Sequence, residues 1–259
     1  MLISLNLFEV YAPQGAFTGT FAGTISFSNT QESVLHTAEM IQKAYHDATR
    51  RTLEIWNSHP ESGVVRSEPF YHPTRLAITS GNRAGPAMAG LLSELKAVTR
   101  GDPLADVAPP DGMHFTFFPV TQALYDKPED APGTGELIAI FRKHCGGLIM
   151  HIRDLRLIAL PDQLLLAGFP DEESQRVRQS LVDDLMKTPW AEKIRERFPH
   201  TEIPPIFWHS TLLRYSAQYL PEPLRVCFHE NQHRNFGALS LPVRLVMTNY
   251  NWTETFTLV

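Results

Sequence analysis

Hydrophobic and polar residues recur along the chain with two periods, and these periods predict its helices and strands. Alternating or β-branched and aromatic runs predict strands over 21–27, 74–79, 113–120, 149–160, 163–169, 207–215, 241–249 and 253–259. Apolar residues at three- and four-residue steps predict helices over 31–56, 86–98, 135–145, 172–188 and 222–235. Residues 57–73 are rich in Pro, Gly, Ser and charge, which indicates a loop. The chain is therefore expected to be an α+β protein.

From residue 74 the order of predicted elements repeats, which indicates a diverged duplication. HFTFFPV and HSTLLRY are each followed by a helix and then by a similar strand, LRLIAL or VRLVMT. The expected fold is bilobed, with two antiparallel sheets facing a central cleft, helices outside, and one histidine strand at the centre of each sheet. Its parts would be a strand-helix extension over 1–73, which covers one lobe or gates the cleft, and a duplicated domain over 74–259, with lobes over 74–148 and 149–259 and exchange of strands between them left open.

Two His-x-Thr motifs carry the strongest chemical signal. In a strand, residues i and i+2 point to the same face, so the imidazole and hydroxyl of His114 and Thr116, and of His209 and Thr211, project side by side. Two such pairs across a cleft supply an acid, a base and two hydroxyl donors, as phosphodiester cleavage requires. If the motifs had no function, both histidines would be core residues. A third match at His72 has proline in the middle and falls in the predicted loop.

These motifs resemble those of a known family, the 2H phosphoesterases. MHFTFF is similar to the first motif of their bacterial RNA 2′-5′ ligase-like branch, and HSTLLR, which ends in Arg214, is similar to the second. The similarity covers about residues 74–259. The resemblance implies a bilobed fold, a metal-independent reaction on cyclic phosphodiesters or 2′-5′ linkages without a cofactor, and active-site roles for His114, Thr116, His209 and Thr211.

Further residues are candidates for substrate contacts. Arg214 lies five positions after His209, so a regular strand would turn it to the opposite face, and only a strand end or a bulge would let it bind phosphate. A surface salt bridge is its alternative role. The candidates for stacking a base are Tyr215, Tyr250 and Trp252, with packing as the alternative. The GNRAG segment at 81–85 is expected to be a plain connecting turn, because it lacks the Gly-Lys-Ser/Thr ending of a nucleotide-binding loop.

Composition and charge indicate which classes of partner and which cellular compartment to expect for this chain. The formal charge is −5, and no window holds a block of Lys and Arg, so a long duplex nucleic acid is not an expected partner. The expected substrate is a small nucleotide or an RNA end. No apolar run reaches membrane-span length and the N-terminus lacks signal-peptide features, which predicts a cytoplasmic protein without membrane contact. The two cysteines, Cys145 and Cys227, indicate neither a disulfide framework nor a cysteine zinc site. The oligomeric state stays open.

Two alternative functions come from the same sequence. His229, Glu230 and His233 form an HExxH string, with Glu254 as a conceivable third ligand, and such a string on a helix is typical of zinc peptidases. The helical period turns His229 and His233 away from the apolar arc, so the pair is expected to face solvent and no metal site is expected. The second alternative is a nucleotide- or RNA-binding module that has lost catalysis.

Overall fold

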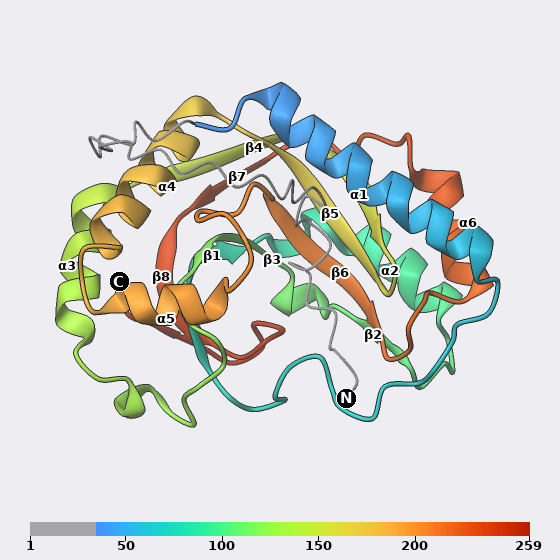
Figure 1. The fold of residues 1–259 in the computed structure, drawn as a ribbon, viewed down its shortest axis with the longest axis horizontal. Coiled ribbons are helices and arrows are strands. Elements are labelled where there is room, and N and C mark those ends of the chain that lie inside the picture. The colour runs from blue at the N-terminus through green and yellow to red at the C-terminus, as the bar shows by residue number, and fades with distance from the viewer. Residues whose placement is uncertain (1–34) are drawn as a thin grey trace, which may run out of the picture.

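Two antiparallel sheets form the centre of the molecule and helices cover them from outside (Figure 1). The computed structural model describes residues 35–259. The strands are β1 Ala77–Arg83, β2 Ala105–Val107, β3 His114–Pro119, β4 Ile149–Leu160, β5 Gln163–Pro170, β6 His209–Tyr215, β7 Leu239–Pro242, β8 Arg244–Thr248 and β9 Thr255–Thr257. The α-helices are α1 Ala38–Ser58, α2 Ala89–Val98, α3 Thr134–Cys145, α4 Glu172–Leu185, α5 Trp190–Arg197 and α6 Glu222–Asn231. The expected α+β architecture is confirmed.

The two sheets repeat one strand pattern. The first sheet has the order β3-β1-β8-β9, and the second has the order β2-β6-β5-β4-β7. If the short β2 is set aside, β3, β1, β8 and β9 match β6, β5, β4 and β7 in position, and all pairings are antiparallel. LRLIAL in β4 and VRLVMT in β8 occupy matching places, and each lies in the sheet of the other motif. The duplicated pattern of the sequence thus becomes a pseudo-symmetric pair of sheets.

The histidine strands lie at or near sheet edges, so the expected central position was wrong. β3 is an edge strand of the first sheet, and β6 is one place in from the edge, beside β2. The reason is the crossing of β4 and β8, since each follows one motif in the chain but takes an inner place in the sheet of the other motif. This arrangement brings β3 and β6 into contact with each other, and the two motifs lie where the sheets meet.

The C-terminal strand pattern divides at a proline. The run over 241–249 was expected to be one strand, but β7 ends at Pro242 and pairs with β4, whereas β8 begins at Arg244 and pairs with β1. Proline has no N–H for a sheet ladder, which favours a strand end there. The chain therefore passes from one sheet to the other within two residues.

Other boundaries also differ from expectation. β1 begins at Ala77 and continues to Arg83, so most of the GNRAG segment is strand and not a turn. α1 begins at Ala38 because the Thr37 side chain accepts a hydrogen bond from the N–H of Met40 and caps it. α6 ends at Asn231, not at 235. The pattern had no signal for β2 or α5, which are short. The expected strand at 21–27 and the helix start at 31–34 lie outside the described residues.

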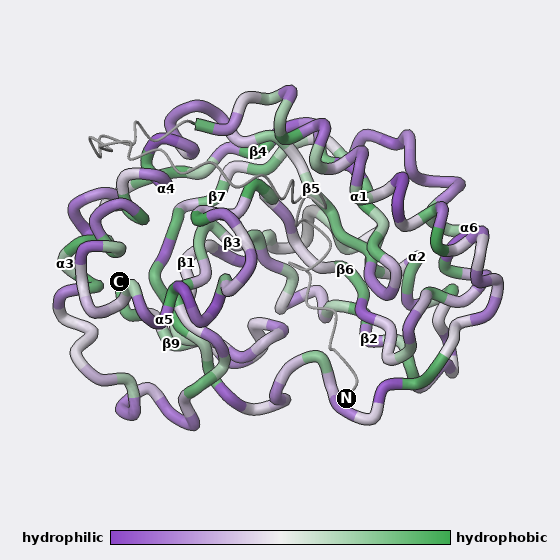
Figure 2. The backbone as a smooth tube through the Cα atoms, viewed as in Figure 1, coloured by the Kyte–Doolittle hydropathy of each residue, from purple (hydrophilic) through white to green (hydrophobic). Residues whose placement is uncertain are grey.

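α1 lies along the five-stranded sheet and is fixed to it by side chains on its buried face (Figure 1). The Tyr45 hydroxyl donates to the Gly168 carbonyl at 2.8 Å, Thr52 donates to the Ala159 carbonyl at 3.0 Å, and the Trp56 indole donates to the Pro161 carbonyl at 3.0 Å. Figure 2 shows the corresponding distribution, with hydrophobic segments in the strands and hydrophilic ones along the outer helices. α1 therefore covers the second sheet as a fixed layer.

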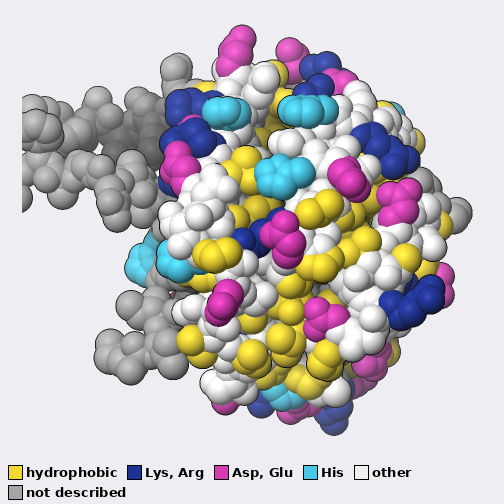
Figure 3. Space-filling model, turned by 90° about the vertical axis from the view of Figure 1, so that its right-hand side faces the viewer, with side chains coloured by type: hydrophobic (Ala, Val, Ile, Leu, Met, Phe, Trp, Pro, Cys, Tyr) yellow, Lys and Arg dark blue, Asp and Glu magenta, His cyan; other side chains and the backbone are white. Residues whose placement is uncertain are grey.

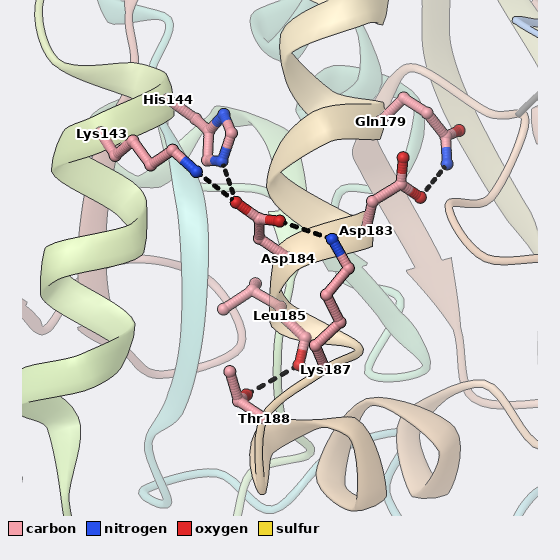
Figure 4. Close-up of polar contacts among 8 residues, drawn as sticks. All are labelled: Lys143, His144, Gln179, Asp183, Asp184, Leu185, Lys187 and Thr188. Carbon is pink, nitrogen blue, oxygen red and sulfur yellow. Dashed lines mark hydrogen bonds and ion pairs between the residues drawn. The ribbon is translucent and has the colours of Figure 1, made fainter.

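α3 and α4 are joined by a charged cluster (Figure 4). Asp184 of α4 accepts from Lys143 at 2.7 Å and His144 at 2.8 Å, both of α3, and from Lys187 at 2.8 Å. These bonds hold the pKa of Asp184 well below its usual range. Because Lys143 and Lys187 are exposed, water screens their pairs with Asp184 and each of these pairs contributes little stability by itself. No helix within residues 35–259 is both long enough and apolar enough to cross a membrane.

Candidate active site

The two His-x-Thr motifs line one cavity. This cavity has a volume of about 710 Å³, and its described lining includes His114 and Thr116 of β3 together with His209 and Thr211 of β6. Both histidines are half-buried, so each imidazole is shielded from bulk water but borders the cavity. The structure brings together four side chains that lie up to 97 positions apart in sequence. His72 lies outside this cavity lining, in a turn where its Nδ1 accepts from the N–H of Arg75 at 3.2 Å.

His114 is held by two contacts that fix its ring. Its Nδ1–H donates to the Gly112 carbonyl at 2.8 Å, and its face stacks on Trp252 with ring centroids 4.5 Å apart and planes 13° apart. A carbonyl accepts only, so the proton of the neutral ring is assigned to Nδ1. The Nε2 atom is then the one that can exchange a proton with a ligand.

Two glycines allow the backbone to close around this histidine. A Cβ on Gly81, whose φ is +150°, would lie 2.2 Å from the Phe115 carbonyl oxygen of β3. A Cβ on Gly112 would lie 2.0 Å from the Asn251 carbonyl oxygen, in the loop that carries Trp252. Both contacts are too short for any side chain. Arg83 completes the arrangement, since its guanidinium donates to the Trp252 carbonyl at 3.0 and 2.6 Å.

His209 has a different environment, dominated by arginines. Its ring meets Phe207 edge-on at 6.0 Å, and Arg214, Arg178 and Arg197 act on it electrostatically. Burial, with these charges, lowers the pKa of His209 to about 4. Burial also lowers the pKa of His114 to about 3, against the opposing effect of its bond to Gly112. Both imidazoles are therefore neutral at pH 7 in the unliganded protein.

A β-bulge turns Arg214 into the cavity. β5 and β6 pair Leu164 with Leu213 but Leu165 with Thr211, so one residue of β6 is left unpaired and the alternation shifts. The odd spacing from His209 that predicted the opposite face is thereby compensated. Arg214 is buried, and its guanidinium carbon lies 5.1 Å from the ring centre of Tyr71 and 5.4 Å from that of Tyr250. Arg214 also forms an ion pair with Asp106, in which a guanidinium nitrogen lies 3.8 Å from a carboxylate oxygen.

The three aromatic candidates for stacking a base have different positions and contacts in the structure. Tyr250 lines the cavity and stacks on Tyr71 with centroids 6.1 Å apart and planes 16° apart. Trp252 also lines it, but its face is taken by His114. Tyr215 is outside this lining; burial and the Asp102 carboxylate raise its pKa. Of the three, Tyr250 and Trp252 therefore line the cavity, and each already has one ring stacked on it.

Among the cavity residues that the sequence pattern did not indicate are Tyr71, Arg178 and Arg197. Tyr71 lies in the irregular segment before β1, where no periodicity exists to indicate its direction. Arg178 had a usable signal, because it lies three positions before Leu181 and so shares the apolar face of α4. Arg197 ends α5, which was itself not predicted.

The cavity is positive although the chain is negative. Five basic side chains and two acidic ones are among the described residues that line it, whereas the whole chain has a formal charge of −5. On the face shown in Figure 3, Lys and Arg side chains are scattered among Asp and Glu. The basic lining therefore forms a local field that favours an anionic ligand.

The HExxH string does not form a ligand set. His229 and Glu230 are exposed near the end of α6, and His233 is exposed after the helix has ended. The expected solvent-facing orientation is confirmed, although the two histidines do not share a helical face. Within residues 35–259 no three His, Cys, Asp or Glu side chains, Glu254 included, are placed to hold a metal ion together. Cys145 and Cys227 are free and buried.

Comparisons with known proteins give distant structural likenesses only. No family model and no curated protein matches the sequence. The similar solved structures include TT0787 of Thermus thermophilus, with 16% identity over 70% of this chain and 97% of that one and a TM-score of 0.46. E. coli LigT complexed with ATP has 12% identity over 71% and 93%, with a TM-score of 0.41. The conserved protein of unknown function ATU0111 from Agrobacterium tumefaciens str. C58 has 12% identity over 73% and 89%, with a TM-score of 0.43.

Proposed function

We propose that this protein is a metal-independent phosphodiesterase that acts on a small cyclic phosphodiester or a 2′-5′-linked nucleotide or RNA end. The observation that supports this most is the shared cavity of the two His-x-Thr motifs, with Arg214 turned toward the same space. Two imidazoles, two hydroxyls and a guanidinium are the groups that an in-line displacement at phosphorus uses. Membership of the 2H phosphoesterases is part of this proposal, on the order and strand setting of the motifs.

The reaction divides between the two histidines. One neutral imidazole takes a proton from a water or ribose hydroxyl as its oxygen bonds to phosphorus. The other imidazole, protonated, gives its proton to the leaving oxygen as the old P–O bond breaks. Thr116, Thr211 and Arg214 hold the non-bridging oxygens while negative charge builds on them. Because Nδ1 of His114 is engaged with Gly112, Nε2 is its transferring atom in either role.

The unliganded site is arranged to change protonation when a phosphate binds. Burial and neighbouring cations lower the pKa of both His114 and His209. A bound phosphate is anionic, and its charge stabilises an imidazolium beside it. Substrate binding therefore raises the protonated fraction of the acid, and the proton is taken up with the ligand.

A substrate panel tests the proposal. Purified protein is incubated with 2′,3′-cyclic nucleotides, 2′-5′ and 3′-5′ dinucleotides and cyclic dinucleotides, with and without EDTA, and products are identified by chromatography. We expect turnover of a cyclic phosphate or a 2′-5′ linkage, unchanged by EDTA and unchanged in His233→Ala. Activity lost in EDTA and restored by zinc would instead favour a zinc hydrolase, and tight binding without turnover would favour a binding module.

A further inference from the structure

Arg178 is a buried cation for which the described part of the chain offers no counter-ion. It projects from α4, is 3% exposed, and lines the cavity. Its guanidinium lies over the Trp208 ring, 3.7 Å from the centroid. Its Nε is buried without a hydrogen-bond partner, and none of the ion pairs among residues 35–259 includes it. The aromatic face compensates only part of the desolvation of such a charge.

The acidic residues of the cavity are engaged elsewhere. Asp47 of α1 pairs with Lys43, and Glu202 pairs with His36 at 3.4 Å. The Tyr45 hydroxyl, which lies near Arg178, donates to the Gly168 carbonyl. Within the described lining, the charge of Arg178 is thus left for a ligand to balance.

Arg178 and Arg197 lie on the side of the cavity next to His209. Both act on His209, where Arg214 acts more strongly, and neither is among the cations that act most strongly on His114, which are Arg214 and Arg83. Arg197 extends from α5 toward the cavity, where its side chain also interacts with Tyr71, and its Nε atom is buried without a hydrogen-bond partner. The space of about 710 Å³ is larger than a single phosphate group requires. A second anionic group of the same ligand therefore fits beside the catalytic centre.

We infer that Arg178 and Arg197 form a second anion subsite, which binds a phosphate monoester of the ligand distinct from the phosphodiester at the histidines. The inference rests on the proposed function for the place of that first phosphate. A guanidinium presents a planar fork of N–H donors that matches phosphate oxygens, and it stays charged when buried. The preferred substrate class is then a nucleoside cyclic phosphate or short oligonucleotide that carries a further phosphate, as a 5′-phosphorylated end does.

Isothermal titration calorimetry measures the affinity of ligands for the subsite without requiring turnover. The probes are adenosine 2′-monophosphate and adenosine 2′,5′-bisphosphate, product analogues that differ by one phosphate. We expect the wild type to bind the bisphosphate about tenfold tighter, and Arg178→Met to remove that preference while changing monophosphate affinity by about twofold or less. Arg176→Met is the matched control, because it removes the same charge from an exposed position of α4 and should keep the preference.

Several outcomes would overturn the subsite. Equal wild-type affinity for both probes would do so, as would an equal loss for both in Arg178→Met, which would place Arg178 at the first phosphate. If Arg178→Met loses its near-ultraviolet circular dichroism, Arg197→Met, at a half-buried position, decides in its place. An unchanged preference in Arg197→Met would then contradict the inference.

Turnover measurements distinguish a failure of the subsite from a failure of the proposed phosphodiesterase activity. The substrates are adenosine 2′,3′-cyclic phosphate with and without a 5′-phosphate. If neither is opened but the bisphosphate preference depends on Arg178, the subsite stands and the phosphodiesterase proposal fails. If both are opened with equal kcat/KM in the wild type and in Arg178→Met, the phosphodiesterase stands and the subsite fails.

Discussion

The two histidine strands carry almost the same tripeptide in unlike surroundings. His114 on β3 is fixed by a backbone carbonyl and by the face of Trp252. His209 on β6 instead meets Phe207 edge-on and lies in the field of three arginines. The two strands thus carry like side chains, while Arg178 and Arg197 act on His209 and Arg214 acts on both rings. Pseudo-symmetric strands therefore need not give a symmetric site.

The largest expected effect comes from the histidines themselves. His114→Ala and His209→Ala should each lower kcat by roughly 10²–10⁴-fold on the best substrate, because each removes one of two coupled proton transfers. The double variant should be little worse than the poorer single variant. His72→Ala, in the third His-x-Thr match outside the cavity lining, is the control and should keep full activity. Near wild-type turnover in either single variant would exclude the paired mechanism.

The threonines should have the next largest effect. Thr116→Val and Thr211→Val each remove a hydroxyl donor at nearly constant volume, and each should lower kcat by roughly tenfold to a thousandfold, as loss of an oxyanion donor does. Thr74→Val, in the exposed third match, is the matched control. If the cavity threonines behave like this control in steady-state kinetics, phosphate contact falls to Arg214 alone.

The pH dependence of kcat/KM should follow the lowered pKa values. With the pKa of His114 at about 3 and that of His209 at about 4, both rings are neutral at pH 7, whereas the reaction needs one of them protonated. The active fraction should therefore rise about tenfold for each unit of pH decrease between about 7 and 5. Limbs close to the ordinary histidine pKa of about 6.5, as the motifs alone would suggest, would contradict this environment.

The lowered histidine pKa values also make the free energy of unfolding depend on pH. Stability must therefore be measured as a control for the kinetic experiment. An unfolded histidine protonates near its ordinary pKa of about 6.5, while the folded rings do not. The unfolded state binds more protons as pH falls through this range, so the free energy of unfolding should decrease from about pH 7 toward 4. Urea unfolding at each pH should be measured beside the kinetics, and ¹H–¹⁵N NMR of both rings reports the titrations directly.

Trp252 offers a smaller test of the asymmetry. Trp252→Leu removes the ring that stacks on His114 and should lower kcat by up to about tenfold, because an aromatic pair contributes roughly 0.5–1.5 kcal/mol. Trp252→Phe should restore most of the loss. The NMR titration of His114 should change while that of His209 stays. Equal changes at both rings would indicate a general loss of packing.

The smallest expected effects concern glycines and stability. Gly81→Ala should lower the free energy of unfolding by about 1–3 kcal/mol, because its φ is +150° and its Cβ would meet the Phe115 carbonyl. Gly90→Ala, in helix α2 with open space around it, should be neutral or stabilising by up to about 1 kcal/mol. Urea titrations check both. Equal free energies of unfolding for the two variants would mean that the close approach of β1 to β3 does not require glycine at position 81.

Local patterns predicted most elements of this fold. β4, β5 and α3 begin and end within one or two residues of their expected positions, since each has a strong period and clear turn residues at its ends. β2 and α5 were missed because three and eight residues are too few to establish a period. The two strands in 241–249 were read as one because hydrophobic pattern does not record which sheet a strand joins.

The side chains of the candidate site could be identified from the chain alone, because two His-x-Thr pairs lie on matching strands and side chains that alternate in a strand project each pair to one face. The surroundings of these pairs depend on long-range packing. The crossing of β4 and β8 made β3 an edge strand, the β6 bulge reversed the direction of Arg214, and the packing of α4 and α5 placed Arg178 and Arg197 beside His209. Each depends on contacts between segments far apart in the chain, which local periodicity does not encode.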